Sequence, residues 1–347
     1  MKIVLVAPIE EPVPPAKYGG TELVVSNLAE EMTSRGHEVY LLAAGDSKTT
    51  AHLVPLVPVS LRKKYSSSEI DTWRSTEKLL SISRVLREIK NLKPDVVFNH
   101  MGWRLVPFDE HIECPVYTTI HGPLTSPSEI LTYQQYPGAK LISISDNQRL
   151  AMPKLNWVRT IYNGIETSLF HQQQSTDRSY FAFLGRTSPQ KGLKEICQMI
   201  LKTQHRLKIA AKVDNEDAQY YESEIKPLID GQQIEFVGEI GPAEKTAFLH
   251  AAKGLLLWLN WEEPFGLVVA EAMACGTPVI VNRRGAMPEL VRNGETGYLV
   301  NSLDEMQSHL DKVAAINPKT CQQYIQDNFS SQRMAQNYID LAMKNGE

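Results

Sequence analysis

Residues 255–281 read LLLWLNWEEPFGLVVAEAMACGTPVIV, the most informative stretch of the chain. The apolar run Leu255–Leu259 is typical of a buried β-strand, and a second short apolar run ends the stretch. Between them, small and apolar residues after Gly266 predict a helix. Gly276 suits the residue that caps such a helix, and Pro278 stops it before the next strand. The stretch therefore predicts one strand–helix–strand unit of a parallel sheet.

The same alternation of short apolar runs and helical segments fills the rest of the chain. The other expected strands are Ile3–Ala7, Val39–Ala43, Val96–Asn99, Val116–His121, Leu141–Ser145, Tyr180–Leu184, Leu207–Lys212, Ile234–Val237 and Tyr298–Val300. Helices are expected over Gly20–Arg35 and Glu69–Lys90, and a polar connector over 171–178. Apolar strands that alternate with helices predict the α/β class. We expect two doubly wound, Rossmann-like domains, with a ligand cleft at the carboxyl ends of their strands.

Length and composition exclude several classes of protein. The 347 residues suffice for two domains, and 42% hydrophobic and 22% charged residues are typical of a globular chain. The net charge of −4 argues against nucleic acid as a partner. No apolar run is long enough to span a bilayer, and an early Pro8 and Glu10 make residues 3–7 a first strand rather than a signal peptide.

The four cysteines, Cys114, Cys197, Cys275 and Cys321, are isolated from one another and from histidines at ligand spacing. This pattern predicts reduced thiols in a cytoplasm rather than a disulfide framework or a zinc site.

The loop and helix start at residues 262–271 suit an anionic ligand. Gly266 lets a ligand approach the backbone closely, and the free amides of Leu267 and Val268 would face a diphosphate at the positive end of the helix. Glu271, about one turn further on, is placed to accept hydrogen bonds from the two hydroxyls of a ribose. Glu263, on the loop, would meet the sugar end of the same ligand. The plainer alternative is an ordinary strand–helix–strand unit with solvated glutamates.

A second candidate follows the strand Tyr180–Leu184, where Gly185–Gly192 reads GRTSPQKG. Arg186 and Lys191 on this strand-to-helix loop are typical ligands of a diphosphate, and Lys212 is a further candidate for the phosphates. The nearest approach to an Asp-x-Asp metal motif is DNED at 214–217. Protein cations rather than a metal would then stabilise a departing diphosphate. Solvated loop charges are the alternative.

The whole string Glu-Pro-Phe-Gly-x4-Glu-Ala-Met-Ala-x-Gly-Thr-Pro-Val resembles the E-x7-E signature of family 4 retaining glycosyltransferases, which have the GT-B fold. The resemblance runs along nearly the whole chain. The combination of YGGTE (18–22), HGP (121–123) and SISDNQ (143–148) is similar to a bacterial subgroup that includes antibiotic-pathway (avilamycin-type) enzymes.

The resemblance implies an N-terminal acceptor domain over 1–165 and a nucleotide-sugar donor domain over 166–330. A last helix over about 331–345 would pack back on the first domain. It implies that Gly19 and Gly20 lie near the sugar and diphosphate, that His121 contacts the sugar hydroxyls and that Ile240 packs on the base. The expected catalytic residues are His121 and Glu263. The expected donor-binding residues are Gly19, Gly20, Arg186, Lys191, Lys212, Ile240, Phe265, Gly266, Leu267, Val268 and Glu271.

The implied activity is that of a hexosyltransferase that moves a hexose from a nucleotide diphosphate sugar, a UDP-sugar being favoured, to an unknown hydroxyl. The implied mechanism is front-face attack with retention, with neither metal nor cofactor. The acceptor would be a small molecule, a saccharide or a lipid. Two alternatives stay open: a UDP-sugar 2-epimerase on the same architecture, and a non-catalytic nucleotide-sugar binder.

The segment Leu61–Lys93 carries nine Lys and Arg against four Asp and Glu. Such a face is typical either of a weak peripheral contact with an anionic membrane or of a solvated helix, and the solvated helix is the simpler explanation.

Overall fold

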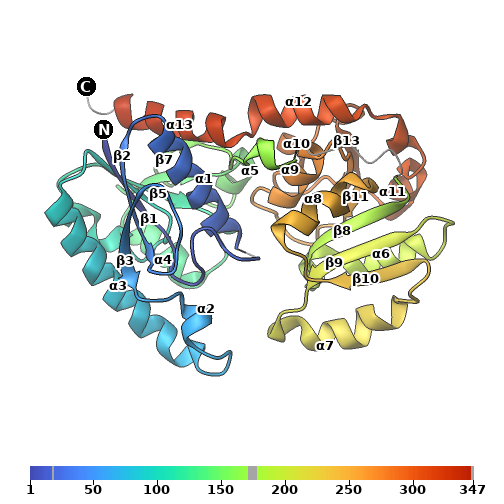
Figure 1. Ribbon diagram of the computed structural model, residues 1–347, viewed down its shortest axis with the longest axis horizontal. Helices are drawn as coiled ribbons and strands as arrows, with labels where there is room; N and C mark the ends of the chain where they lie inside the picture. Colours follow the sequence, from blue (N-terminus) through green and yellow to red (C-terminus); the bar gives the residue numbers. More distant parts are fainter. Residues whose placement is uncertain (18, 171–177, 345–347) are drawn as a thin grey trace. The chain divides into compact units, whose positions relative to one another are not determined.

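The computed structural model describes residues 1–17, 19–170 and 178–344, which form two compact units. Unit 1 comprises Met1–Gly164 and Ser331–Glu347, and unit 2 comprises Ile165–Ser330 (Figure 1). The expected polar connector over 171–178 lies almost wholly outside the described residues. Within them, no helix combines the length and the apolar character needed to cross a membrane.

Unit 1 is built on a seven-stranded parallel sheet with the order β3-β2-β1-β4-β5-β6-β7. Its strands are β1 (Lys2–Val6), β2 (Glu38–Ala44), β3 (His52–Val57), β4 (Val96–Asn99), β5 (Val116–Ile120), β6 (Lys140–Ser143) and β7 (Trp157–Thr160). Its helices are α1 (Gly20–Ser34), α2 (Leu61–Lys64), α3 (Ile70–Leu92), α4 (Pro127–Gln135), α5 (Asp146–Arg149) and α13 (Ser331–Lys344). The central strand β1 is buried on both faces, which explains its continuous apolar run.

Unit 2 is built on a six-stranded parallel sheet with the order β10-β9-β8-β11-β12-β13. Its strands are β8 (Tyr180–Arg186), β9 (Leu207–Lys212), β10 (Ile234–Gly238), β11 (Ala252–Leu257), β12 (Val279–Asn282) and β13 (Gly297–Val300). Its helices are α6 (Leu193–Ile200), α7 (Ala218–Tyr220), α8 (Pro242–His250), α9 (Leu267–Ala274), α10 (Met287–Leu290), α11 (Leu303–His309) and α12 (Pro318–Asn328). In the register of the sheet, Leu184 of β8 lies opposite Ala210 of β9.

The strand order reverses once in each sheet, between β1 and β4 in unit 1 and between β8 and β11 in unit 2. In open sheets of this kind, ligands bind beyond the carboxyl ends of the strands at such a reversal. The loops that follow β1, β4, β8 and β11 are therefore where a site is expected. The prediction of two doubly wound α/β units is confirmed.

Two strands, β3 and β7, were not predicted from the sequence. Both are edge strands of the unit 1 sheet, so each pairs with a neighbouring strand of the sheet on one side only. β3 contains Pro55, which an edge strand tolerates, and all four residues of β7 are only half-buried. Neither segment therefore carries the continuous apolar run of a central strand.

Helix α13 belongs to unit 1 although it ends the described chain (Figure 1). The buried Tyr338 places its hydroxyl 2.8 Å from Thr119 Oγ1 of β5, and its ring packs edge-on against Phe98 of β4. Arg35, directly after α1, donates to the main-chain oxygen of Gln332 at 2.8 Å. These contacts anchor the helix to both the sheet and α1.

Candidate functional site

The loops after β8 and β11 in unit 2 are joined at the strand reversal. The main-chain amide of Asn260 donates to Gln190 O at 2.8 Å, and its side-chain amide donates to Pro189 O at 3.0 Å. These bonds hold the cationic loop after β8 beside the loop that carries Glu263. The sequence placed a site on each loop, and the fold brings them together.

Lys191 and Glu263 form an ion pair between these two loops. Their side chains are 14% and 13% exposed, so the pair is largely shielded from solvent. The ammonium group of Lys191 also lies 4.8 Å from the centre of the Trp261 ring, in a cation–π contact. The ion pair fixes the position of the Glu263 carboxylate and keeps the positive charge of Lys191 next to it.

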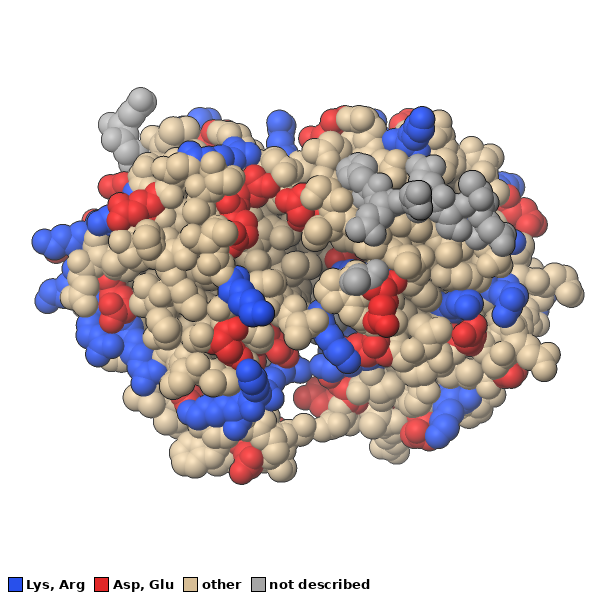
Figure 2. Space-filling model, in the orientation of Figure 1, with Lys and Arg blue, Asp and Glu red and all other residues tan. Residues whose placement is uncertain are grey.

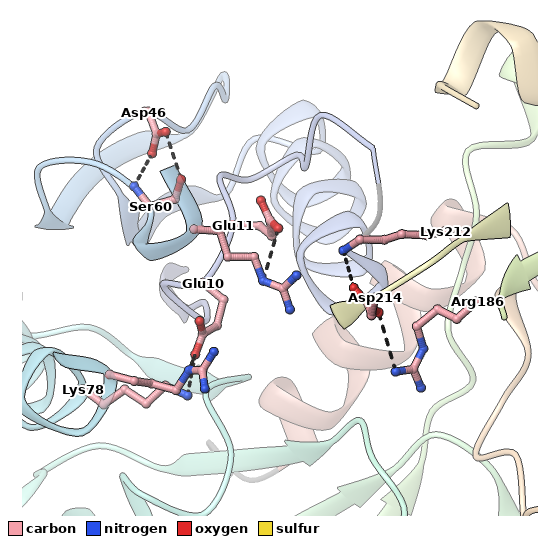
Figure 3. A network of polar contacts seen from close by, with 10 residues as sticks. Glu10, Glu11, Asp46, Ser60, Lys78, Arg186, Lys212 and Asp214 are labelled. Carbon is pink, nitrogen blue, oxygen red and sulfur yellow. Dashed lines mark hydrogen bonds and ion pairs between the residues drawn. The ribbon is translucent and has the colours of Figure 1, made fainter. Parts of the chain in front are cut away.

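Arg186 and Lys212 end the neighbouring strands β8 and β9, and both face the carboxylate of Asp214 (Figure 3). Lys212 Nζ lies 2.9 Å from Asp214 Oδ1, and Arg186 Nη1 lies 3.9 Å from Asp214 Oδ2. Asp214 stands in the DNED stretch, which the sequence analysis considered only as a metal motif. Here it is an anion between two cations, and its place two residues beyond β9 is the signal that could have identified it.

Three polar atoms on these loops are buried without a hydrogen-bond partner among the described residues. They are Arg186 Nε, Ser188 Oγ and Trp261 Nε1. Each carries a proton that it can donate. A buried donor without an acceptor costs free energy, so the cluster favours a ligand that is rich in acceptor oxygens.

The N-terminus of α9 opens on this site. Gly266 caps it with φ = 94°, a left-handed conformation that favours glycine, and a Cβ here would lie 2.6 Å from Met287 Cε. The first bond of the helix is the one from Val269 N to Gly266 O, at 2.9 Å. The amides of Leu267 and Val268 precede it and have no place in the intrahelical ladder, so they are available to an anion.

Phe265 contributes packing rather than an accessible ring. Its side chain is 2% exposed and packs edge-on against Phe329 at 5.9 Å between ring centres. Only its backbone is therefore placed to take part in donor binding.

Glu271, on α9, is buried and paired with Lys245 of α8. The carboxylate side chain is 3% exposed and the lysine 20%. The sequence predicted Glu271 but not Lys245, because a partner 26 residues away on another helix leaves no local pattern.

The backbone of Glu263 is supported by a turn that the sequence analysis did not consider. Ala286 N donates to Glu263 O at 2.9 Å, and Gly285 N donates to Glu262 Oε2 at 2.9 Å. Gly285 has φ = 58°, and a Cβ on it would overlap the main-chain nitrogen and oxygen of Glu263. This turn therefore sets the position of the predicted catalytic loop.

Ile240 follows β10, which is the edge strand of the unit 2 sheet. It is half-buried on the loop before α8. The loop leads into α8, which carries Lys245, the partner of Glu271.

In unit 1, His121 lies directly after β5 and is hydrogen-bonded to His100, directly after β4. His100 Nδ1 and His121 Nε2 are 2.8 Å apart. Burial lowers the pKa of His121 to about 4. Burial, together with the neighbouring His121, also holds the pKa of His100 well below its usual range. Both rings are therefore neutral around pH 7.

The glycine motif of unit 1 begins α1. Tyr18 lies outside the described residues; Gly19 caps the helix and Gly20 is its first residue. A Cβ on Gly19 would lie 2.7 Å from Pro15 Cβ. Burial raises the pKa of Glu22, in the first turn, to about 7, and the nearby carboxylates of Glu11 and Glu10 add to the shift.

Many cations of the basic segment 61–93 are paired with carboxylates of unit 1. The pairs include Arg62–Glu11 at 3.5 Å, Lys63–Asp46 at 3.7 Å, Arg74–Glu10 at 3.2 Å and Lys78–Glu10 at 2.7 Å. Figure 3 shows the contact of Glu10 with Lys78, and Figure 2 shows acidic side chains interspersed with basic ones on the face drawn. This pairing reduces the charge left to attract an anionic surface.

Across residues 1–17, 19–170 and 178–344, no three His, Cys, Asp or Glu side chains are grouped as ligands of a metal ion would be. The four cysteines are all free.

Two family models together match most of the chain. Residues 18–169 match the model described as Glycosyltransferase Family 4, and residues 165–329 match the model described as Glycosyl transferases group 1. The two matches meet at the boundary between the two structural units.

Known proteins of similar sequence and fold carry related names. N-acetyl-alpha-D-glucosaminyl L-malate synthase from Bacillus anthracis is 24% identical, covering 81% of this chain and 80% of the relative. AviGT4, a glycosyltransferase involved in avilamycin A biosynthesis, has a crystal structure with a TM-score of 0.77 and 21% identity, covering 99% and 97% of the two chains. HepE from Anabaena, crystallised with UDP and glucose, has a TM-score of 0.75 and 18% identity, covering 99% and 100%.

Proposed function

The chain belongs to the glycosyltransferases, with a family 4 domain followed by a group 1 domain in a GT-B fold, and on that premise we propose a specific reaction. In this proposal the enzyme transfers a hexose from a UDP-sugar to a hydroxyl acceptor, retains the anomeric configuration and needs no metal.

The observation that carries the proposal is a set of cations at the strand reversal of unit 2. Arg186 and Lys212 end β8 and β9, and Lys191, on the loop after β8, pairs with Glu263 just before the start of α9. A diphosphate needs positive charge and hydrogen-bond donors along its length, and this part of unit 2 offers both. UDP is the favoured nucleotide because HepE, of similar fold, has been crystallised with UDP and with UDP-glucose.

Six of the predicted residues then have the following roles in the donor complex. The amides of Leu267 and Val268, together with Arg186 and Lys212, bind the diphosphate, and Glu271 accepts hydrogen bonds from the ribose hydroxyls. Glu263 faces the sugar. Because three cations can neutralise the departing diphosphate, the reaction needs no divalent ion in this scheme.

The proposed step is front-face substitution at the anomeric carbon. The bond from that carbon to the diphosphate oxygen breaks while a bond to the acceptor oxygen forms on the same face. The acceptor proton passes to the departing diphosphate. No covalent enzyme intermediate is formed, so Glu263 acts by stabilising positive charge on the sugar.

The roles of the two units follow the same proposal. Unit 2 binds the donor, and unit 1, with His121 and the Gly19–Gly20 turn, meets the acceptor and the sugar. A cytoplasmic location stays a prediction, which the free cysteines support.

Water can serve as the acceptor in a first test. The protein is incubated with UDP-α-glucose in EDTA, and the early product is followed by proton NMR before the sugar mutarotates. We expect UDP and α-glucose, with the rate unchanged by EDTA. Appearance of β-glucose first, or strict dependence on a metal, would contradict the proposal.

The same experiment separates the alternatives. A 2-epimerase would yield the epimerised sugar or its nucleotide without an acceptor. A non-catalytic binder would shift the thermal unfolding of the protein on adding UDP-glucose, yet leave the sugar nucleotide intact.

A further inference from the structure

The two histidines at the ends of β4 and β5 occupy different surroundings. His100 is 3% exposed, whereas His121 is half-buried. The ring of His100, directly after β4, is therefore much less accessible than that of His121. Its ring is tilted by 36° against that of His121, with the centres 5.1 Å apart.

The ring of His100 is held in place from several sides. Its amide donates to Val6 O of β1 at 2.8 Å, and its ring centre lies 5.8 Å from that of Tyr338 on α13. Tyr338 is in turn hydrogen-bonded to Thr119 at 2.8 Å. Sheet and helix thus fix a ring whose only polar contact, within the part of the chain that the structure describes, is with His121.

The contact leaves one nitrogen of His100 unsatisfied. Its Nε2 is buried without a hydrogen-bond partner among the described residues. A neutral imidazole carries one proton, so two arrangements are open. Either His100 Nδ1–H donates to His121 Nε2, or His121 Nε2–H donates to His100 Nδ1.

The two arrangements differ in what they bury. If His121 donated, the proton of His100 would sit on the buried Nε2 as an orphaned N–H. If His100 donates, that nitrogen is a bare acceptor. Orphaned buried N–H groups are the rarer of the two in folded proteins, so the arrangement in which His100 donates to His121 is favoured.

We propose that His100 is a positioning residue that donates from Nδ1 to His121 Nε2 and thereby fixes the proton of His121 on Nδ1. His121 then presents an N–H donor to an oxygen of the substrate and does not act as a general base. The substrate contact rests on the proposed function; the direction of the hydrogen bond does not.

Nitrogen-15 NMR of the histidine-labelled protein tests the direction without any substrate. Long-range correlations from the ring carbons' protons distinguish a protonated from a bare ring nitrogen, and a His121→Asn sample identifies the His121 signals. At about pH 7 we expect both rings to carry the proton on Nδ1. Protons on Nε2 of both rings would overturn the proposal.

Activity of two variants then tests the positioning role. In His100→Asn the side-chain amide can take the place of Nδ1–H, whereas His100→Leu has no donor. We expect the Leu variant to lose kcat/KM on the order of tenfold and the Asn variant to recover most of it. In the nitrogen-15 spectra, the proton of His121 should stay on Nδ1 in the Asn variant and should be shared between the two ring nitrogens in the Leu variant.

Equal loss in both folded variants, with the His121 proton pattern unchanged, would show that His100 is merely structural and overturn the proposal. Circular dichroism and thermal unfolding establish that each variant is folded. If instead the unmodified protein transfers no sugar, the proposed function fails while the NMR result still decides the direction of the hydrogen bond.

Discussion

The ammonium group of Lys191 is ion-paired with the carboxylate of Glu263, and this pair joins the loops that follow β8 and β11. The lysine is thus placed where it both orients a carboxylate and adds positive charge. Glu263→Gln keeps the size of the side chain but removes the charge. We expect kcat to fall on the order of 100-fold, with a smaller change in donor affinity, because the charge is used mainly in the transition state.

Glu262→Gln is the matched control for this experiment. Glu262 precedes Glu263, is 61% exposed and pairs with Arg284 at 3.3 Å. Turnover of UDP-sugar should stay close to that of the unmodified enzyme. Equal turnover in the two variants would remove Glu263 from the catalytic residues.

Asp214 competes with a diphosphate for the same cations. It pairs with Lys212 and faces Arg186 at the strand ends. Asp214→Asn should therefore lower the Kd for UDP, by roughly three- to tenfold, because a ligand anion no longer displaces a protein anion. Isothermal titration calorimetry measures this change.

Glu216→Gln makes the same charge change at an exposed neighbouring position and should leave the Kd nearly unchanged. A weaker affinity in Asp214→Asn would instead make Asp214 a residue that positions the two cations.

Lys245 should matter for stability as well as for donor binding. Lys245→Met leaves the buried Glu271 carboxylate without its counter-ion, which we expect to cost about 2 kcal/mol of unfolding free energy. The figure is below that of a fully buried pair because the lysine is partly exposed. Lys226→Met breaks the exposed Lys226–Glu222 pair, whose side chains are both 59% exposed, and should change stability very little. Urea unfolding of both variants tests the difference, and equal losses would contradict it.

Glu22 should make stability depend on pH. Burial raises its pKa from 4.5 to about 7, so the folded state binds this proton more tightly than the unfolded state. Its contribution is fully present below about pH 4.5 and is lost as the pH rises through about 7. Relative to Glu22→Gln, which mimics the protonated acid, the unmodified protein should lose about 3 kcal/mol between these limits. Urea unfolding at several pH values checks this, and a constant difference between the two proteins would refute it.

The sequence predicted the parts of the fold that burial dictates. Central strands such as Val96–Asn99 stand out because both their faces are covered, whereas the edge strands β3 and β7 carry no such run. Ser66 and Glu69 have the spacing of a capping box but form only half of one: Ser66 N donates to Glu69 Oε2 at 3.1 Å, and Ser66 Oγ donates to the same oxygen instead of accepting a main-chain bond.

The candidate site divides in the same way. Residues at strand ends, such as Arg186 and His121, could be predicted because the topology places such ends together. Their partners could not. Lys245 and Gly285 act through contacts between separate elements, and neither stands in a local pattern that distinguishes it from other lysines or glycines. Asp214 is the exception, because its place two residues beyond β9 could have identified it.

Gly285 provides the sharpest test of how the Glu263 loop is held. Gly285→Ala places a Cβ against the main chain of Glu263 and also imposes a left-handed conformation on alanine. Gly294→Ala is the matched control, because Gly294 has φ = 81° but open space around it. The control carries only the conformational cost, about 1 kcal/mol.

Gly285→Ala should lose clearly more stability, since the main chain of Glu263 would have to move to make room for the added Cβ. It should also lower turnover as Glu263 moves, while Gly294→Ala retains activity. Thermal unfolding and the UDP-release assay measure the two effects. Equal loss of stability and equal turnover in both variants would show that the turn does not position Glu263.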